Sequence, residues 1–263
     1  MTITKYFHIA KISMRNVFAY KADVFAHSLF IGLIIFIFIN LWQVIFIDPN
    51  NAIEGFTLTM MIWYLVLTES IVTSFGRLVE DMGNEIQSGE IATKLTKPYN
   101  YLLFQYSQNI SKSLFRFTTT FIVGALLTLY FVGPLNFSLT SIPFIIISVL
   151  AAITLHFCLM ALISTSIFWL EEAKAIDFLY SKIVFIIGGM FFPLEIFPDW
   201  LASISAKLPF SYIAYFPAKL FVSFSLNDFF KVFLTQLFWI AVIITLNYVM
   251  YQFIISKIQI HGG

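Results

Sequence analysis

Charged residues and cysteines are the scarcest features of this sequence. Asp, Glu, Lys and Arg make up 11% of the 263 residues, whereas roughly 25% is usual, and Cys158 is the one cysteine. A disulfide within the chain and metal clusters built on several cysteines are therefore excluded. Neither G-x-x-x-x-G-K-[ST] nor G-x-G-x-x-G occurs, so we do not expect the chain to bind ATP itself. The hydrolase motifs H-E-x-x-H and G-x-S-x-G are also absent, and the sequence indicates no enzyme.

Long apolar runs are abundant instead. Hydrophobic residues account for 60% of the chain, against about 45–50% in a soluble domain. A bilayer crossing needs about 20 mostly apolar residues. Runs of that kind cover residues 24–46, 57–75, 114–133, 142–170, 174–192 and 232–255. The sequence therefore predicts an all-α membrane protein with six transmembrane helices, folded as a single domain over residues 1–263.

The basic residues predict the orientation of these crossings. Twelve Lys and Arg residues fall in the first segment, in the connections between runs two and three and between runs four and five, and in the tail, whereas three fall on the other side. Basic residues accumulate in cytoplasmic loops. We therefore expect a multi-pass protein of the cytoplasmic membrane, with both termini in the cytoplasm.

Two cytoplasmic segments have a character of their own. Residues 1–23 place apolar side chains at three- and four-residue steps among basic ones, which predicts an amphipathic helix at the membrane surface. A solvent-facing helix is the alternative. Residues 76–113 form the largest polar block, and we expect there a short helix, parallel to the membrane, that docks on a cytoplasmic partner. A solvated loop is the alternative.

The outer connection, residues 193–231, is apolar but interrupted by prolines. Four of the eight prolines lie here, at Pro193, Pro198, Pro209 and Pro217. The segment is too broken to span the bilayer and too apolar for a free loop. Short re-entrant helices buried against other protein would satisfy its backbone groups. A surface loop with an aromatic belt is the alternative.

Few ionisable residues fall within the apolar runs. Glu69 lies in the second run and His156 in the fourth. An ionisable group inside a membrane is a candidate for a transport pathway. A hydrogen bond between helices is the structural alternative for both, and it is favoured for His156 because its neighbours are apolar, Ser or Thr.

Two segments resemble a known family of transporters. GEIATKLTKPYN at 89–100 resembles the G-E-I-x-x-x-L-x-[KR]-P signature after the second span of ABC-2-type permeases. GGMFFPLEIFPDWLASISAKLPFSYIAYFP at 188–217 resembles the proline-containing block between spans five and six of that family. The resemblance covers nearly the whole chain and implies a permease domain without its own ATPase.

The resemblance also implies partners and a site. Such a permease pairs with a second copy or a sister permease and with ATP-binding subunits, so ATP and Mg²⁺ would bind on a separate chain. We expect membrane lipid around it and no nucleic-acid partner. The segment after span two then corresponds to a coupling helix in contact with the ATPase. The residues at or near this contact would be Glu85, Gln87, Gly89, Glu90, Lys94, Lys97 and Pro98.

The resulting hypothesis is a subunit of an ATP-driven exporter of apolar or amphipathic substrates. The coupling segment would transmit closure of the ATPase to the spans, and the re-entrant segment with its four prolines would act as the outer gate. The alternatives are a secondary transporter or channel using Glu69 and His156, an intramembrane enzyme, and a membrane scaffold that transports nothing.

Overall fold

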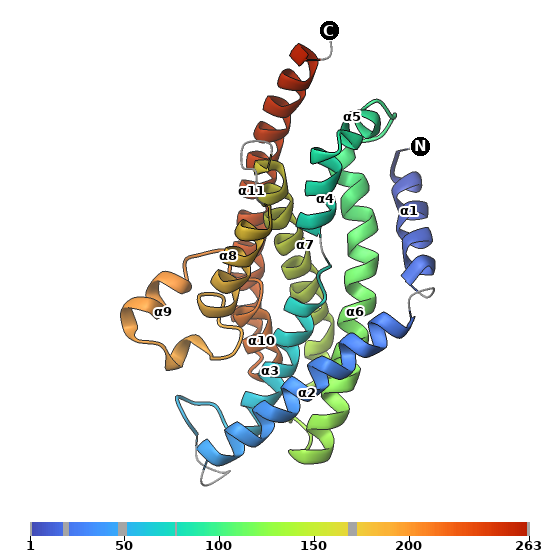
Figure 1. The fold of residues 1–263 in the computed structure, drawn as a ribbon. Coiled ribbons are helices and arrows are strands. Elements are labelled where there is room, and N and C mark those ends of the chain that lie inside the picture. The colour runs from blue at the N-terminus through green and yellow to red at the C-terminus, as the bar shows by residue number, and fades with distance from the viewer. Residues whose placement is uncertain (1, 18–20, 47–51, 77, 168–172, 262–263) are drawn as a thin grey trace.

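The computed structural model describes residues 2–17, 21–46, 52–76, 78–167 and 173–261 (Figure 1). The predicted turn at 47–51 and Arg77, one of the basic residues used for orientation, lie outside these residues. The described chain is built of helices: α1 Thr2–Val17, α2 Lys21–Ile45, α3 Leu58–Thr73, α4 Leu78–Gln87, α5 Glu90–Leu95, α6 Tyr101–Phe131, α7 Ile142–Ser166, α8 Ala173–Ile186, α9 Asp199–Ser205, α10 Tyr215–Val222 and α11 Leu226–His261, with 3₁₀ turns at Leu139–Ser141 and Leu194–Ile196.

Five segments of the described chain are long and apolar enough to cross a membrane. They are Phe25–Ile45, Leu58–Glu85, Tyr101–Phe131, Leu139–Ser166 and Leu226–Phe253. The fifth predicted crossing, 174–192, corresponds to α8, which has 14 residues and ends at Ile186. At 1.5 Å per residue such a helix spans about 21 Å, less than the roughly 30 Å apolar core of a bilayer. An all-α membrane protein is confirmed, and the count of six stays a prediction.

Helix α8 nevertheless returns the chain along the bundle. Figure 1 shows α7 and α11 running in the same direction, toward the end that carries α5, with α8 descending between them in the sequence. Helix α8 and the turns that follow it must therefore bring the chain back before α11 begins. The turn at Gly188–Gly189 ends the helix early, and the chain continues through α9 and α10.

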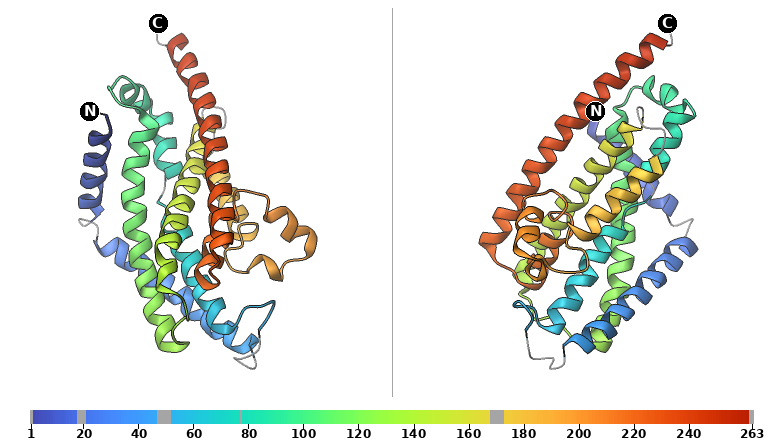
Figure 2. Two further views of the ribbon diagram at one scale, coloured as in Figure 1. Left: turned by 180° about the vertical axis from the view of Figure 1, so that it is seen from behind. Right: turned by 60° about the vertical axis from the view of Figure 1, so that its left-hand side comes forward.

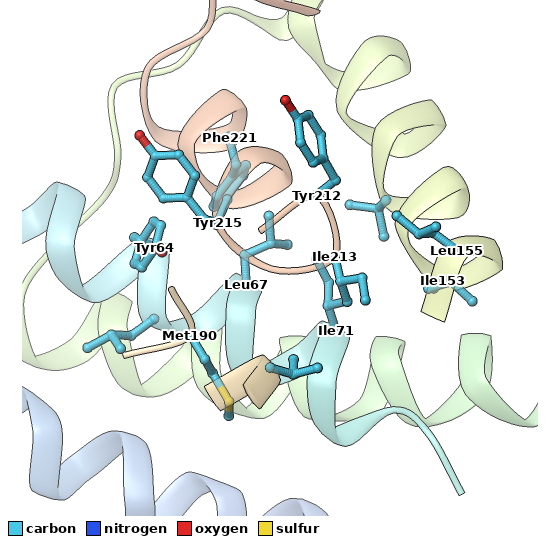
Figure 3. Packing of buried hydrophobic residues seen from close by; sticks show 14 of the residues in the cluster. Tyr64, Leu67, Ile71, Ile153, Leu155, Met190, Tyr212, Ile213, Tyr215 and Phe221 are labelled. Carbon is cyan, nitrogen blue, oxygen red and sulfur yellow. The ribbon is translucent and has the colours of Figure 1, made fainter. Parts of the chain in front are cut away.

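Helix α3 lies at the centre of the bundle. Every residue from 61 to 71 is buried, as expected for a helix that is apolar on all sides. Helices α2, α6, α7 and α10 pack around it, and Figure 3 shows Leu67 and Ile71 among side chains of α7 and the α10 region. Gly124 of α6 permits close approach, because a Cβ there would lie 2.8 Å from Ile35 and 2.9 Å from Val66.

The outer surface of the bundle is apolar along its length. Leu126 and Tyr130 of α6 and Phe238 and Phe253 of α11 are among many large apolar side chains that are exposed. A soluble monomer rarely exposes so much contiguous apolar surface. This surface is therefore suited to contact with membrane lipid.

The segments at residues 1–23 and 76–113 differ in arrangement from the sequence prediction. Helix α6 begins at Tyr101 rather than near residue 114, so the second half of the predicted 76–113 connection is part of a long helix. Helix α1 runs beside this extension of α6, along the bundle rather than across it (Figure 1). Helix α4 also stands along the bundle, packed on α7 and α8, so the predicted short helix parallel to the membrane is wrong for α4. The position of α1 follows from the extra length of α6, which offers a packing surface beyond the apolar run.

Candidate functional site

The polar segment after the second crossing forms two short helices joined by a sharp turn. Helix α4 ends at Gln87, and Gly89 precedes α5 with a φ of +75°. Glycine adopts this left-handed conformation without the steric cost that a Cβ brings. The turn reverses the chain, so that Lys94 of α5 reaches back to the last turn of α4. The glycine of the G-E-I signature therefore has a structural explanation.

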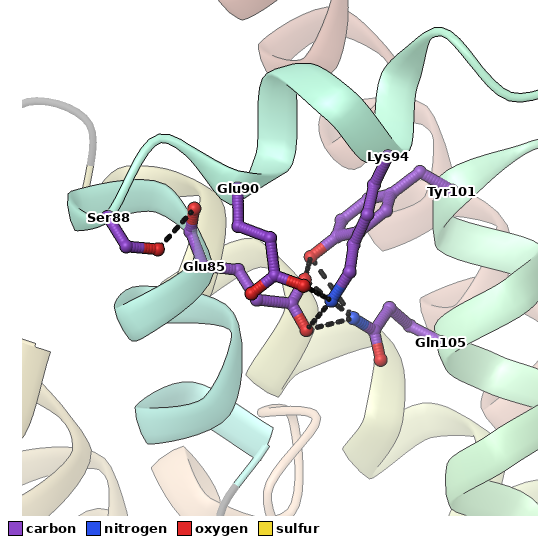
Figure 4. A network of polar contacts seen from close by, with 6 residues as sticks. All are labelled: Glu85, Ser88, Glu90, Lys94, Tyr101 and Gln105. Carbon is purple, nitrogen blue, oxygen red and sulfur yellow. Dashed lines mark hydrogen bonds and ion pairs between the residues drawn. The ribbon is translucent and has the colours of Figure 1, made fainter.

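A network of five side chains joins α4, α5 and α6; we call Glu85, Glu90, Lys94, Tyr101 and Gln105 the coupling network (Figure 4). Lys94 Nζ lies 2.7 Å from Glu85 Oε1 and 3.1 Å from Glu90 Oε1. The Tyr101 hydroxyl donates to Glu85 Oε2 at 2.6 Å. Gln105 Nε2 donates to both Glu85 oxygens, at 3.3 and 3.2 Å, and to the Tyr101 hydroxyl at 3.1 Å. Glu85 is thus the common acceptor.

The position of Glu85 explains why so many donors surround it. A carboxylate in the last turn of a helix faces the negative end of the helix dipole, which is unfavourable. Three donor side chains from two other helices offset this cost. Tyr101 and Gln105 are buried while Glu90 is 58% exposed, so the network has an inner part on α6 and an outer rim on α5.

The electrostatics of Lys94 follow from the same geometry. Burial by itself would lower the pKa of the Lys94 ammonium, but hydrogen bonds and charge attraction from Glu85 and Glu90 outweigh burial and raise the pKa above its ordinary value. A raised folded-state pKa stabilises the fold below the unfolded value of about 10.4, and the effect is lost only as pH rises through the folded value. The ion pair therefore persists through neutral pH.

Helix α1 contacts the chain where it turns from α5 into α6. Lys5 Nζ donates to the Pro98 carbonyl oxygen at 2.9 Å. The backbone N–H of Asn100 donates to the Tyr6 hydroxyl at 2.9 Å, and Asn100 Oδ1 caps α6 by accepting from the Leu103 N–H at 3.0 Å. The N-terminal helix is thereby attached to the coupling segment.

The structure brings three of the seven predicted coupling residues into one network. Lys94 pairs with both Glu85 and Glu90, and Gly89 forms the turn between α4 and α5. Gln87 is exposed at the end of α4; Lys97 is also exposed, and the carbonyl oxygen of Pro98 is bound by α1.

Sequence reasoning missed Tyr101 and Gln105, because it began the third span near residue 114. Their four-residue spacing places Tyr101 and Gln105 on one face of a helix, and this spacing could have identified the pair from the sequence.

The four prolines of the outer segment each mark a bend. Pro193 and Pro198 precede the 3₁₀ turn and α9, both in extended conformation, which fits the fixed φ of proline. Pro209 opens the turn toward α10, and Pro217 lies in the first turn of α10. The segment divides in two: α10 is buried against α3, α7 and α11, whereas α9 projects to the side with Trp200 66% exposed (Figure 2).

A second polar group, the outer cluster of Glu195, Tyr215 and Lys219, holds this segment together. The Tyr215 hydroxyl donates to Glu195 Oε1 at 2.7 Å, and Lys219 Nζ pairs with the same oxygen. Lys219 Nζ also donates to the Tyr215 hydroxyl at 2.9 Å. The prolines of this segment were predicted as functional from the sequence, whereas Glu195 and Lys219 were not.

Glu69 and His156 occupy different surroundings. Glu69 of α3 is 2% exposed, and its Oε1 has no hydrogen-bond partner among the described residues. His156 of α7 stacks on Phe75 with ring centroids 3.6 Å apart and meets the Tyr180 ring edge-on at 5.4 Å. Aromatic packing thus accounts for much of the surroundings of His156, but its Nδ1, like Glu69 Oε1, has no hydrogen-bond partner among the described residues.

These features define a multi-pass, all-α membrane protein whose bundle carries a two-helix polar projection at one end. The sequence model of the family described as ABC-2 family transporter protein matches residues 29–262. The chain belongs to this family, as the resemblance of its two signature segments indicated, and it is a membrane permease of an ABC transporter. Membership implies association with an ATP-binding subunit and a permease partner. No curated protein matches the chain.

Proposed function

We propose that this chain forms half of the translocation pathway of an ATP-driven exporter for apolar or amphipathic substrates. Two permeases, identical or sister chains, would enclose the pathway, and separate subunits would bind ATP and Mg²⁺. The protein would lie in the cytoplasmic membrane with its termini in the cytoplasm. The observation that carries this proposal is the α4–α5 projection, a polar unit held to the bundle by the coupling network.

The projection has the properties that a coupling element needs. Its rim is exposed at Glu90 and Lys97, where a partner can dock. Its base is tied to α6 through Tyr101 and Gln105, and α4 packs on α7 and α8. A displacement of α5 would therefore reach three helices of the bundle through buried contacts rather than through a flexible loop. In the proposed mechanism, a movement of α5 at this end rearranges the membrane-spanning helices.

The outer segment supports the proposed gate at the other end of the pathway. Helix α10 is buried beside α3, and the side chains of Tyr64 and Thr68 bind the carbonyl oxygens of Gly189 and Met190. The outer cluster links α10 to the 3₁₀ turn through Glu195. A movement of α3 would thus displace the proline-containing segment, which is how we propose that the four prolines act.

The family match favours this proposal over a secondary transporter, a channel or a scaffold. Glu69 has a possible role of its own within the exporter. Its buried carboxylate has an oxygen without a hydrogen-bond partner, and such a group could contact a polar part of the substrate. We propose it as a pathway residue within the exporter, and His156 as an interhelical packing residue.

Charge reversal on the exposed rim tests the coupling. The permease, co-expressed with ATP-binding subunits of the same genome, would carry Glu90→Lys together with Lys97→Glu. We expect loss of co-purification and of permease-stimulated ATP hydrolysis, with unchanged amounts of folded permease, because the pair Glu90–Lys94 on the surface contributes little to stability. The matched control is Glu54→Lys, an exposed position four residues before α3, whose first turn lies at the opposite end of the bundle from α5. Unchanged binding and hydrolysis in the double variant would contradict the coupling role.

A further inference from the structure

A polar pocket opens between α4, α5 and α6, directly beside the coupling network. Its volume is about 330 Å³, within the range of small-molecule sites. Glu85 and Glu90 line one end of the pocket, and Glu85 contacts Gln105 of α6. Lys112, which also lines the pocket, follows Gln105 on α6 and lies about 10 Å further along the helix axis. The pocket therefore has acidic groups at one end and a basic group at the other.

The length of α6 places this pocket at the membrane surface. Helix α6 has 31 residues and is about 46 Å long, whereas the apolar core of a bilayer is about 30 Å thick. Its last turn carries Tyr130, which is 83% exposed, and aromatic side chains of this kind are common at membrane interfaces. About 20 residues back from that end, the apolar core ends close to Lys112. The acidic end of the pocket then lies farther out, at the outer edge of the headgroup layer.

The charges at the two ends are not balanced locally. Glu85 and Glu90 share one cation, Lys94, so these three groups together carry one negative charge in excess. Lys112 forms no ion pair within the part of the chain that the structure describes. A pocket with opposite charges at its two ends favours a ligand that carries the complementary charges in the matching order.

Carboxamide groups line the pocket between these ends. Gln105 is 4% exposed, and its Nε2 donates within the coupling network. Its Oε1 points away from Glu85 and Tyr101 and accepts no hydrogen bond from the described residues (Figure 4). Gln108 and Asn109 line the pocket from the next turn of α6. Carboxamides supply both donors and acceptors, so they suit phosphate oxygens on one side and an ammonium group on the other.

We propose that this pocket binds the headgroup of an aminophospholipid, from the leaflet at the coupling-network end of the bundle. The phosphate binds Lys112 and the Gln108 amide, and the ammonium group binds Gln105 Oε1 and the two carboxylates of the coupling network. The acyl chains stay in the bilayer. A phospholipid carries its phosphate next to the hydrocarbon and its ammonium group farther out, which is the order of the complementary groups in the pocket. A basic side chain of a cytosolic partner fits less well, because Lys112 would repel it.

Native mass spectrometry of the purified permease in detergent tests the binding. The probes are phosphatidylethanolamine and phosphatidylglycerol with the same acyl chains, which share the phosphate, whereas only the first has an ammonium group. We expect the first equivalent of phosphatidylethanolamine to bind about five- to tenfold more tightly, the ratio that one net hydrogen bond or exposed ion pair provides. Soluble glycerophosphoethanolamine, which has the same head without acyl chains, should not displace this lipid at equal concentration.

Variants at the two ends separate the two contacts. Glu90→Gln removes the excess negative charge at a position that is 58% exposed, and it should bring the two affinities together. Lys112→Gln should weaken the binding of both lipids, whereas Lys112→Arg, which keeps the charge, should retain it. The matched controls are Asp228→Asn and Lys231→Gln, which neutralise an exposed ion pair near the start of α11 and should change neither affinity.

Four outcomes would overturn the inference. Equal affinities for the two lipids in the unmodified permease would remove the ammonium contact. A preference that survives both Glu90→Gln and Lys112→Gln would show that the lipid binds elsewhere. Equal competition by glycerophosphoethanolamine would assign the pocket to a soluble phosphate ester. No lipid preference, together with stronger co-purification of an ATP-binding subunit with Lys112→Gln, would show that a basic side chain of that subunit fills the pocket. The lipid titrations contain no ATP-binding subunit, so their result is separable from failure of the coupling proposal.

Discussion

At the scale of single residues, Glu85 organises the end of the bundle that carries α5. It accepts from Lys94, Tyr101 and Gln105, which come from two other helices. The neighbouring Glu90 binds the same lysine from a position that is 58% exposed. The two glutamates therefore share a partner but differ in burial, and their energetic roles should differ accordingly.

Glu85→Ala should destabilise the permease by about 1–3 kcal/mol, because the buried donors of Tyr101 and Gln105 lose their acceptor. Glu90→Ala removes only the exposed helical pair with Lys94 and should cost about 0.5 kcal/mol or less. Thermal unfolding of the two variants in the same detergent measures the difference. Equal costs would contradict the division between a buried base and an exposed rim.

At the scale of elements, the junction between α8 and α10 depends on carbonyl groups that lie outside the regular hydrogen-bond pattern of a helix. The carbonyl oxygen of Gly188 accepts from the Tyr215 N–H at 3.1 Å, and that of Met190 accepts from the Thr68 hydroxyl at 2.7 Å. In an apolar surrounding an unsatisfied carbonyl is expensive. These contacts explain how an interrupted, proline-containing segment is buried between helices. They also require α10 to approach Gly188 and Gly189 closely.

Gly188→Ala should disrupt this junction. An added Cβ would overlap the carbonyl oxygen of Val184 and lie 3.1 Å from that of Phe210, and backbone atoms cannot rotate aside. We expect a loss of about 1–3 kcal/mol and a lower yield of folded protein. Gly76→Ala is the control, since its Cβ would meet the Arg116 guanidinium at 3.1 Å, the mobile end of a long side chain. Gel filtration and thermal unfolding compare them; tolerance at 188 equal to that at 76 would refute the account.

At the scale of the whole molecule, the open point is whether α8 completes a sixth crossing. Helices α7 and α11 run toward the same end, so the chain must return between them (Figure 1). Helix α8 is short for a crossing, but the turns after it and the buried α10 extend the apolar path. An even number of crossings would also agree with the position of α1 beside the coupling segment and of the end of α11 at the same end of the bundle.

Single-cysteine labelling distinguishes the two topologies. In a Cys158→Ala background, an impermeant maleimide should label Glu54→Cys and Asp199→Cys in intact cells, and Ser88→Cys only after permeabilisation. All three positions are exposed. Position 54 precedes α3 and position 199 follows α8, so their agreement would establish that α8 crosses. Labelling of Asp199→Cys together with Ser88→Cys would leave five crossings and contradict the sixth.

Much of the architecture followed from local sequence. Apolar runs predicted membrane helices because crossing length and hydrophobicity are properties of a continuous stretch of chain. The signature at 89–100 pointed to the family, and the family match over 29–262 agrees with both signature segments. The basic residues predicted an orientation that cysteine labelling will decide.

The tertiary structure alone decided which distant groups meet. Tyr101 and Gln105 complete the surroundings of Glu85 only because α6 extends beyond its apolar run. Glu90 and Lys112 line one pocket only when the coupling network holds α4 and α5 against α6. Composition and periodicity describe one segment at a time, whereas hydrogen bonds between helices depend on how those segments are placed in space.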